Sequence, residues 1–252
     1  MDESRQEGIN TLELNFKNGN PGAVQYGNFI NYYQFHSPQS RLRLLPSGVE
    51  IWSTFTEKTF ALDIGSNAGD LTYLLHSFLE EKLSQDCEII GVDIDPVLIE
   101  RAKDKRPCNK LKFLCLDFMN ENGRSYILNY LIDNNLSKFN VIFCFSITMW
   151  IHLNHGDKGL ENFIYQVLNL GEVVVIEPQP WKCYRTAVKR LKRSNEQFPL
   201  FNKLKIRNVE EEIQNMIDKM FGKNIRLIYK SQTTEWGRKI LIYKWNREVL
   251  LA

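Results

Sequence analysis

Two short segments carry residues that could hold a nucleoside-containing cofactor. In residues 60–70 (FALDIGSNAGD) an apolar run breaks into a turn that is bracketed by Gly65 and Gly69. In residues 88–96 (EIIGVDIDP) a second apolar run ends in carboxylates, the first of which is Asp93. Glycine lets the backbone turn sharply close to a ligand, and an acid at the tip of the second strand can accept both ribose hydroxyls. This spacing, which is that of one βαβ unit, predicts an adenosine-binding site.

The turn differs from the dinucleotide-binding motif Gly-x-Gly-x-x-Gly, because Asn67 stands at the position of the middle glycine. A pyrophosphate needs backbone N–H groups that no side chain obstructs, so Asn67 argues against NAD. A ligand with a ribose but no pyrophosphate fits better, and S-adenosylmethionine is the commonest such cofactor. Each segment alone is also compatible with an ordinary βα turn, whereas the two in sequence favour a cofactor site.

Length, charge and cysteine content limit the alternatives. The 252 residues are enough for one sizeable α/β domain, and the net charge of +2 does not by itself indicate nucleic-acid binding. The five cysteines are scattered, without a C-x-x-C pair, which favours reduced thiols over a disulfide framework or a metal site. The N-terminus lacks the pattern of a signal peptide, and no apolar run has membrane-spanning length. We expect a monomeric protein of the cytoplasm that binds neither a membrane nor a metal.

Short apolar runs alternate with helical patterns and predict the elements that position this site. Residues 1–22 are polar and indicate a mobile lead-in, and residues 23–252 are expected to form the domain. Strands are expected at 60–64, 88–92, 111–116, 139–145, 172–177, 225–230 and 239–245. Helices are expected at 70–83, 96–105, 121–134, 157–170 and 209–221. This order predicts a doubly wound α/β sheet that ends in an antiparallel pair.

Polar and aromatic residues follow the expected strands, where α/β sheets bind their ligands. Asp117 and Phe118 suit adenine, through a carboxylate acceptor and a stacking ring; a helix N-cap beside a core aromatic is an equally good interpretation. After the fourth strand, His152 and a second histidine flank Asn154 and could form a polar wall for a substrate. Metal binding is not favoured there, because no third ligand is evident. The stiff segment 177–180 (EPQP) follows the fifth strand and is expected to position another group.

Residues 182–193 contain six basic side chains and no acid, in contrast to the nearly neutral chain. With Trp181 and Tyr184 as stacking groups, such a stretch is typical of a surface that follows RNA phosphates. A solvated helix face is the alternative, but the stretch comes directly after the 177–180 loop, and we favour RNA binding. The side chains expected to contact RNA are Arg43, Lys182, Arg185, Lys189, Arg190 and Arg193.

At these residues the chain resembles a known family, the bicoid-interacting-protein-type RNA 5′-phosphate methyltransferases. The resemblance extends from Tyr26 to about Tyr243. The segments that carry it are 26–28 (YGN), 32–33 (YY), 41–43 (RLR), 63–67 (DIGSN), 93–95 (DID), 150–154 (WIHLN), 156–157 (GD) and 177–181 (EPQPW).

The resemblance implies a seven-stranded, single-domain S-adenosylmethionine-dependent methyltransferase fold, which is consistent with the number of expected strands. It also implies that Tyr32 faces the phosphate. The cofactor contacts that it implies are Tyr33, Arg41, Gly65, Ser66, Asn67, Asp93, Ile94, Asp95, Asp117, Phe118 and Phe145.

The family has two branches, of which one caps the triphosphate end of a small nuclear RNA. The other methylates RNA 5′-monophosphates, chiefly on histidine transfer RNA, with precursor microRNA ends as a further candidate. This chain resembles the second branch at 117–120 (DFMN), 146–150 (SITMW) and 181–185 (WKCYR). Met149 stands where the capping branch carries a lysine that reaches the terminal phosphate, so the resemblance implies that a distal phosphate has no partner here.

Methyl transfer to a phosphate would explain why no general base is evident in the sequence. A terminal phosphate has a second pKa of about 6, so its oxygen is already anionic at neutral pH. Groups that orient the phosphate without neutralising it are favoured, and we expect Tyr32, His152 and Asn154 to be the catalytic residues. A small-molecule methyltransferase and a catalytically inactive RNA-binding scaffold are the two alternatives. The first would not need residues 182–193, and intact Asp63, Gly65 and Asp93 weigh against the second.

Overall fold

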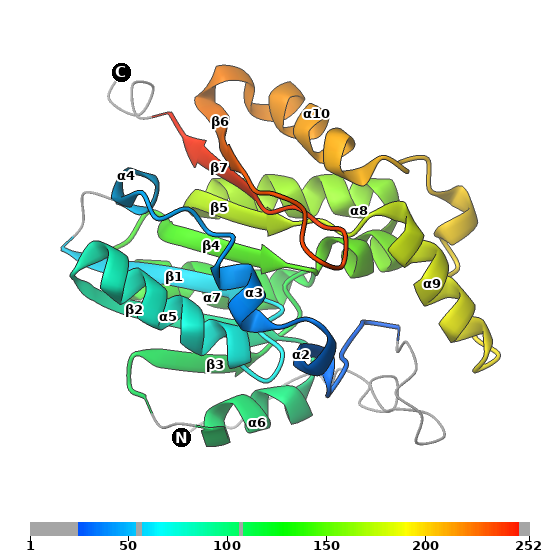
Figure 1. Cartoon of the computed structure of the whole chain (residues 1–252), viewed down its shortest axis with the longest axis horizontal. Helices are drawn as coiled ribbons and strands as arrows, with labels where there is room; N and C mark the ends of the chain where they lie inside the picture. The colour runs from blue at the N-terminus through cyan, green and yellow to red at the C-terminus, as the bar shows by residue number, and fades with distance from the viewer. Residues whose placement is uncertain (1–24, 54–56, 106–107, 247–252) are drawn as a thin grey trace.

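The computed structural model of the chain describes residues 25–53, 57–105 and 108–246 (Figure 1). The predicted lead-in, residues 1–22, lies outside the described residues. In the described part, seven strands form one sheet in the order β3-β2-β1-β4-β5-β7-β6. The strands are β1 Lys58–Ile64, β2 Asp86–Asp93, β3 Leu111–Cys115, β4 Phe139–Phe145, β5 Gly171–Glu177, β6 Ile225–Lys230 and β7 Leu241–Trp245.

The five strands from β3 to β5 are parallel, and their apolar sequences follow from burial on both faces. Every residue of β4 (FNVIFCF) is buried. Helices α5, α6 and α4 cover one face of the sheet, and α7, α8, α9 and α10 cover the other. The helices are α2 Tyr32–Phe35, α3 Pro38–Leu42, α4 Val49–Trp52, α5 Asp70–Leu83, α6 Pro96–Lys105, α7 Glu121–Asp133, α8 Thr148–Leu170, α9 Trp181–Lys192 and α10 Val209–Phe221.

The structure confirms the predicted doubly wound sheet and its seven strands, with differences at the ends of elements. The antiparallel pair is present, but β7 lies between β5 and β6 and runs antiparallel to both. The helix expected at 157–170 begins already at Thr148, and a kink at Gly156 (φ 74°, ψ −174°) divides it. Among the described residues, the helices are all too short or too polar to cross a membrane.

Candidate active site

A pocket of about 230 Å³ opens at the carboxyl ends of the parallel strands, where the sequence places its polar residues. Segments far apart in the chain meet there: α2 and α3, the loops after β1 to β4, and the start of α8. The predicted cofactor and catalytic residues that line it are Tyr32, Tyr33, Arg41, Gly65, Asn67, Asp93, Ile94, Asp117, Phe118, Phe145 and Asn154.

The loop after β1 has the backbone conformation that its residues favour. Gly65 has φ 82°, and a Cβ atom there would come within 3.1 Å of Ile147, so a larger residue would strain the turn and crowd the pocket. Asn67 has φ 52°, a left-handed conformation that asparagine tolerates better than most residues. Its backbone N–H donates to Asp93 Oδ2 (2.8 Å), which joins the two predicted segments.

Two carboxyl groups near the ends of β1 and β2, Asp63 and Asp93, have raised pKa values. Asp93 lines the pocket and also accepts the backbone N–H of Asp95 (3.0 Å). Burial raises the pKa of Asp93 to about 6, although the backbone hydrogen bonds from Asp95 and Asn67 oppose this. Asp63 is buried behind it, accepts from Thr72 Oγ1 (2.7 Å), and has a pKa that burial raises to about 7. Asp93 is therefore the carboxylate that can accept ribose hydroxyls.

Asp117 and Phe118 fit both interpretations of their sequence. Both line the pocket, and Phe118 also belongs to the hydrophobic core, where it packs edge-on against Phe163 with ring centroids 5.6 Å apart. The cap of α7, however, is Asn120, whose side chain accepts from the N–H of Asn122 (2.9 Å). Asp117 instead accepts the N–H of the residue two positions on (2.8 Å), which leaves carboxylate lone pairs for a ligand.

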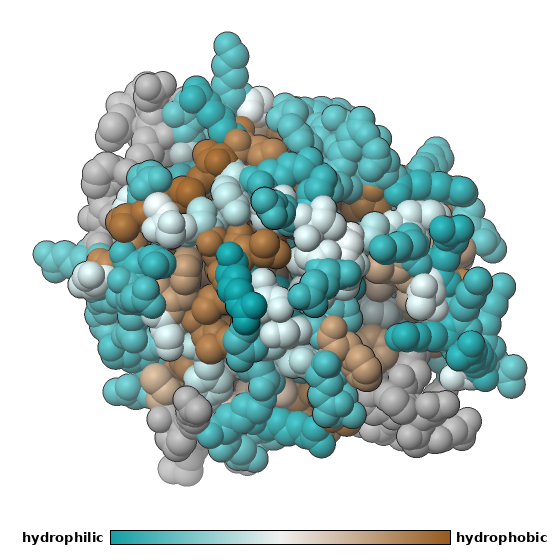
Figure 2. Space-filling view, viewed as in Figure 1, coloured by the Kyte–Doolittle hydropathy of each residue, from teal (hydrophilic) through white to brown (hydrophobic). Residues whose placement is uncertain are grey.

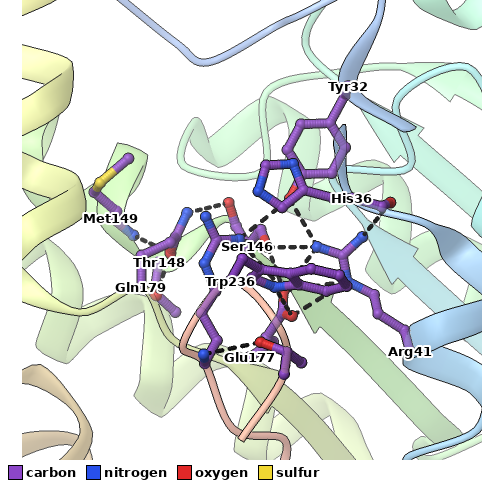
Figure 3. A network of polar contacts seen from close by, with 11 residues as sticks. Tyr32, His36, Arg41, Ser146, Thr148, Met149, Glu177, Gln179 and Trp236 are labelled. Atoms are coloured by element: carbon purple, nitrogen blue, oxygen red, sulfur yellow. Dashed lines mark hydrogen bonds and ion pairs between the residues drawn. The ribbon is translucent and has the colours of Figure 1, made fainter. Parts of the chain in front are cut away.

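At the β5 side of the pocket, Tyr32, Arg41, Ser146, Glu177 and Arg238 form a hydrogen-bonded group that we call the arginine cluster (Figure 3). Arg41 is fully buried, and its Nη2 lies 2.9 Å from Glu177 Oε2. The same nitrogen donates to Tyr32 Oη (2.7 Å) and to Ser146 Oγ (2.9 Å). Ser146 donates in turn to Glu177 and has φ 57°, so strained backbone at the end of β4 brings its hydroxyl into the cluster.

Arg238 comes from the segment between β6 and β7, and no pattern in the sequence pointed to it. Its side chain is 8% exposed, and its Nη1 donates to Ser146 Oγ and to Tyr32 Oη (3.2 Å). The same nitrogen lies 3.6 Å from Glu177 Oε2. Trp236, two residues earlier, donates its indole N–H to Glu177 Oε1 (3.1 Å). The predicted role of the 177–180 loop, to position another group, is thus carried out partly by its first residue.

The arginine cluster carries excess positive charge. Burial raises the pKa of Glu177, but Arg41 and Arg238 outweigh it and hold that pKa below its ordinary value, so Glu177 is a carboxylate. His36 stacks on Tyr32 with ring centroids 4.7 Å apart. Burial and then the two arginines lower the pKa of His36 to about 4, so it is neutral at physiological pH. Two guanidinium groups and one carboxylate leave a net charge of +1.

Gln179 fixes the start of α8, and Met149 does not face the pocket. Gln179 Oε1 accepts from Thr148 Oγ1 (3.1 Å) and from the N–H of Met149 (3.0 Å), and its amide group donates to the Ser146 carbonyl (Figure 3). The Met149 side chain is 4% exposed and packs in the hydrophobic core. Position 149 therefore lies in the core, and the implied lack of a partner there for a distal phosphate stays a prediction.

Three other predicted residues lie outside the pocket lining. His152 is fully buried, with Nδ1 3.0 Å from Tyr184 Oη and Nε2 2.8 Å from Asp157 Oδ1, so both ring nitrogens are engaged. The histidine that lines the pocket is His155. Ser66 is 1% exposed and is not among the lining residues.

Asp95 is the third predicted residue outside the lining, and it is 5% exposed because its side chain binds the start of α6. Its Oδ1 accepts the N–H of Val97 (2.8 Å), and its Oδ2 accepts from Asn28 Nδ2 (2.6 Å). Asn154 does line the pocket, but its Nδ2 donates to the carbonyls of Gln25 (2.9 Å) and Trp150 (2.8 Å). Asn154 thus holds Gln25 at the edge of the site, and neither amide hydrogen is left for a phosphate in this arrangement.

The predicted RNA-binding side chains on α9 share one exposed face. Tyr184, Ala187, Val188 and Leu191 form the buried face of this helix. Figure 2 shows mostly hydrophilic side chains at the right of the view, the side on which Figure 1 places α9. The exposed basic residues of α9 and the position after it are Lys182, Arg185, Lys189, Arg190, Lys192 and Arg193.

Arg43, the remaining predicted RNA contact, is exposed at the end of α3, which packs on α5. It thus belongs to a different element from the α9 surface. Within the described ranges no group of three or more histidine, cysteine or acidic side chains is arranged to hold a metal ion.

Comparisons with known proteins agree with this geometry. Residues 139–245 match the family described as Bicoid-interacting protein 3 (Bin3). The N-methyltransferase NodS from Bradyrhizobium japonicum WM9 superimposes with a TM-score of 0.50 at 13% identity, covering 83% of this chain and 98% of NodS, which shows a shared fold. The 7SK snRNA methylphosphate capping enzyme of Mus musculus is 28% identical over 226 residues, which are 64% of this chain and 32% of that protein.

Two relatives are more similar over most of both sequences. The Pre-miRNA 5′-monophosphate methyltransferase of Xenopus laevis is 37% identical over 243 residues, covering 90% of this chain and 94% of the relative. The RNA 5′-monophosphate methyltransferase of Homo sapiens is 39% identical over 246 residues, covering 91% and 83%. The fold and these relatives agree with S-adenosylmethionine as the cofactor. The chain therefore belongs to the family of RNA 5′-monophosphate methyltransferases.

Proposed function

We propose that this protein transfers a methyl group from S-adenosylmethionine to the 5′-monophosphate of RNA. The observation that carries the proposal is the distribution of charge across the pocket, which is negative on one side and positive on the other. Asp93 ends β2, and the arginine cluster lies around the end of β5, three strand spacings or about 14 Å away. A carboxylate at one side suits a ribose, and a net positive cluster at the other suits an anionic phosphate.

The residues around Asp93 fit the nucleoside part of the cofactor. Asp93 is the acceptor for the ribose hydroxyls, and the Gly65 turn lets the backbone come close without a side chain in the way. Asp117 and Phe118 would hold the adenine, through the carboxylate and the ring. When bound, S-adenosylmethionine supplies an electrophilic methyl group on a sulfonium.

The residues around Tyr32 would orient the acceptor. The terminal phosphate is anionic at neutral pH, because its second pKa is about 6, so the protein does not need to remove a proton. Tyr32 can donate its phenol hydrogen into the pocket, since its oxygen already accepts from Arg41 and Arg238. The contribution of the protein is then proximity and alignment, which are worth several kcal/mol in favourable cases.

The exposed basic face of α9 would bind the RNA that follows the terminal phosphate. The helix begins four residues after Glu177, so this surface starts beside the arginine cluster. Lys182 also lies close to Gly237 in the segment that contributes Arg238. Cationic side chains along such a face bind phosphates independently of sequence and gain affinity from counterion release.

A single terminal phosphate fits the pocket better than three. Arg41 is the one cationic side chain among the described lining residues, and it is already paired with Glu177. A triphosphate would bring further charges that must lose their hydration without a new partner. By resemblance to its family, the preferred RNA is histidine transfer RNA, with precursor microRNA ends as a second candidate. The protein is proposed to act as a monomer in the cytoplasm.

The test is transfer of a labelled methyl group to one RNA sequence prepared with hydroxyl, monophosphate or triphosphate 5′ ends. We expect strong labelling of the monophosphate alone, and loss of labelling after phosphatase treatment. Histidine transfer RNA and precursor microRNA with the same end, compared with another transfer RNA, decide the preferred substrate.

Two other outcomes correspond to the alternative functions. A protein that binds S-adenosylmethionine and labels small molecules but no RNA would be a small-molecule methyltransferase. A protein that binds RNA but neither binds the cofactor nor labels any substrate would be an inactive scaffold. Equal labelling of hydroxyl-ended and monophosphate-ended RNA would refute the phosphate as acceptor.

A further inference from the structure

Arg238 is a second buried guanidinium in a cluster whose carboxylate is already paired. Arg41 donates to Glu177 Oε2 through Nε (3.2 Å) and Nη2 (2.9 Å), and Oε1 accepts from Arg41 Nε (3.3 Å) and from the Trp236 indole (3.1 Å), so both carboxylate oxygens are engaged. Arg238 lies farther from Glu177, at 3.6 Å. Glu177 is a single carboxylate beside two buried guanidinium groups, and its contact with Arg238 is the longer of the two ion pairs, so this ion pair does not fully explain the position of Arg238.

The closer contacts of Arg238 are with hydroxyl groups at the pocket. Its Nη1 donates to Ser146 Oγ and to Tyr32 Oη (3.2 Å). Both hydroxyl oxygens also accept from Arg41 Nη2. Tyr32 and Ser146 line the pocket, whereas Arg238 stands behind them. Arg238 therefore acts on the pocket through these two side chains.

These contacts determine the direction in which the Tyr32 hydroxyl can donate its hydrogen. A tyrosine hydroxyl donates one hydrogen, and a guanidinium has donors but no acceptor. Because Arg41 and Arg238 both donate to Tyr32 Oη, the phenol hydrogen cannot point at either of them. It points away from both guanidinium groups, and the pocket is the side that Tyr32 lines.

We propose that Arg238 is a positioning residue for methyl transfer, which with Arg41 holds the Tyr32 hydroxyl as a hydrogen-bond donor to the terminal phosphate. The inference rests on the proposed function. Without Arg238, the phenol oxygen has a free acceptor site and its hydrogen is no longer restricted to one direction. The acceptor phosphate then loses alignment, and preorganised donors of this kind contribute strongly to the rate.

The test is a double-mutant cycle of Arg238→Gln and Tyr32→Phe, with the 5′-monophosphate RNA as substrate. Arg238→Gln should lower kcat by about tenfold or more, with the Kd for S-adenosylmethionine changed less than about twofold. In the Tyr32→Phe background, which has no hydroxyl to orient, the same substitution should change kcat less than about twofold. Arg226→Gln, an exposed arginine on the adjoining β6, is the matched control and should leave kcat unchanged.

The experiment distinguishes a failure of this inference from a failure of the proposed function. If the wild-type protein does not label monophosphate RNA, the proposed function fails. If it does, and Arg238→Gln has normal kcat or loses the same factor with and without the Tyr32 hydroxyl, the positioning role is wrong. Should Arg238→Gln not fold, Arg238→Lys keeps the charge but not the planar donor group. If Arg238→Lys lowers kcat, and this reduction is absent in the Tyr32→Phe background, the role is supported. If Arg238→Lys has the wild-type kcat, the role is wrong.

Discussion

The pH dependence of cofactor binding tests Asp93 as the ribose acceptor. Burial raises the pKa of Asp93 to about 6, and only the carboxylate form accepts at both oxygens through charge-assisted hydrogen bonds. If binding requires that form, the apparent Kd is multiplied by one plus the ratio of protonated to ionised Asp93. The Kd for S-adenosylmethionine should therefore be about tenfold weaker at pH 5 than at pH 8.

Asp93→Asn should both weaken the binding of S-adenosylmethionine and remove the pH dependence of its Kd. Asparagine can still accept a backbone N–H, but it loses the charge-assisted hydrogen bonds, which costs about 1.5–3 kcal/mol or roughly 10- to 150-fold in Kd. Isothermal titration calorimetry at pH 5, 6, 7 and 8 measures both effects. Asp86→Asn, at the exposed opposite end of β2, is the control and should bind like the wild type.

The reasoning would be refuted by either of two results. A folded Asp93→Asn protein that binds S-adenosylmethionine with wild-type affinity would show that Asp93 does not hold the ribose. A wild-type Kd that stays constant from pH 5 to pH 8 would show that ionisation of this carboxyl is not coupled to binding.

Three further predictions concern charge. Glu177→Gln leaves two buried guanidinium groups without their carboxylate and should lower the free energy of unfolding by about 3–5 kcal/mol in urea denaturation, whereas Glu172→Gln on the same strand should cost under about 1 kcal/mol. Asp63 has a pKa of about 7 in the folded protein, above its unfolded value, so its ionisation lowers the stability of the native state as pH rises from about 4 to 7. In Asp63→Asn, the melting temperature should therefore decrease less over this pH range than in the wild type. The same pH profile in both proteins would contradict the prediction. Glutamine at four exposed positions of α9 and its end should raise the KM for RNA and flatten its salt dependence without changing cofactor affinity, whereas unaltered RNA turnover would mean a merely solvated face. These positions are Lys189, Arg190, Lys192 and Arg193.

The sequence was sufficient for the sheet and for most of the cofactor side of the pocket. Parallel strands that are buried on both faces must be nearly continuous apolar runs, so β1 to β5 are visible without a structure. Their carboxyl ends meet at one edge, and this rule alone selects Asp93, Asp117 and the loop around Gly65.

The arginine cluster was harder to predict, because its members are joined only by the fold. Arg238 follows an antiparallel strand at the far end of the chain, where the strand-end rule does not apply. Trp236 reaches Glu177 from the same segment, and an isolated Trp-Gly-Arg sequence has no distinctive spacing. His152 was predicted to be catalytic but is buried, and His155 lines the pocket. The sequence pattern could not distinguish them, because it did not show that α8 begins at Thr148 and kinks at Gly156.

The most direct test of the central claim is the position of the transferred methyl group on the RNA. After reaction of monophosphorylated histidine transfer RNA with labelled S-adenosylmethionine, nuclease digestion should release the label with the 5′-terminal nucleotide, attached to its phosphate. That phosphate should resist phosphatase, because one of its oxygens is esterified. Label recovered in a base or a ribose of any nucleoside would contradict the account.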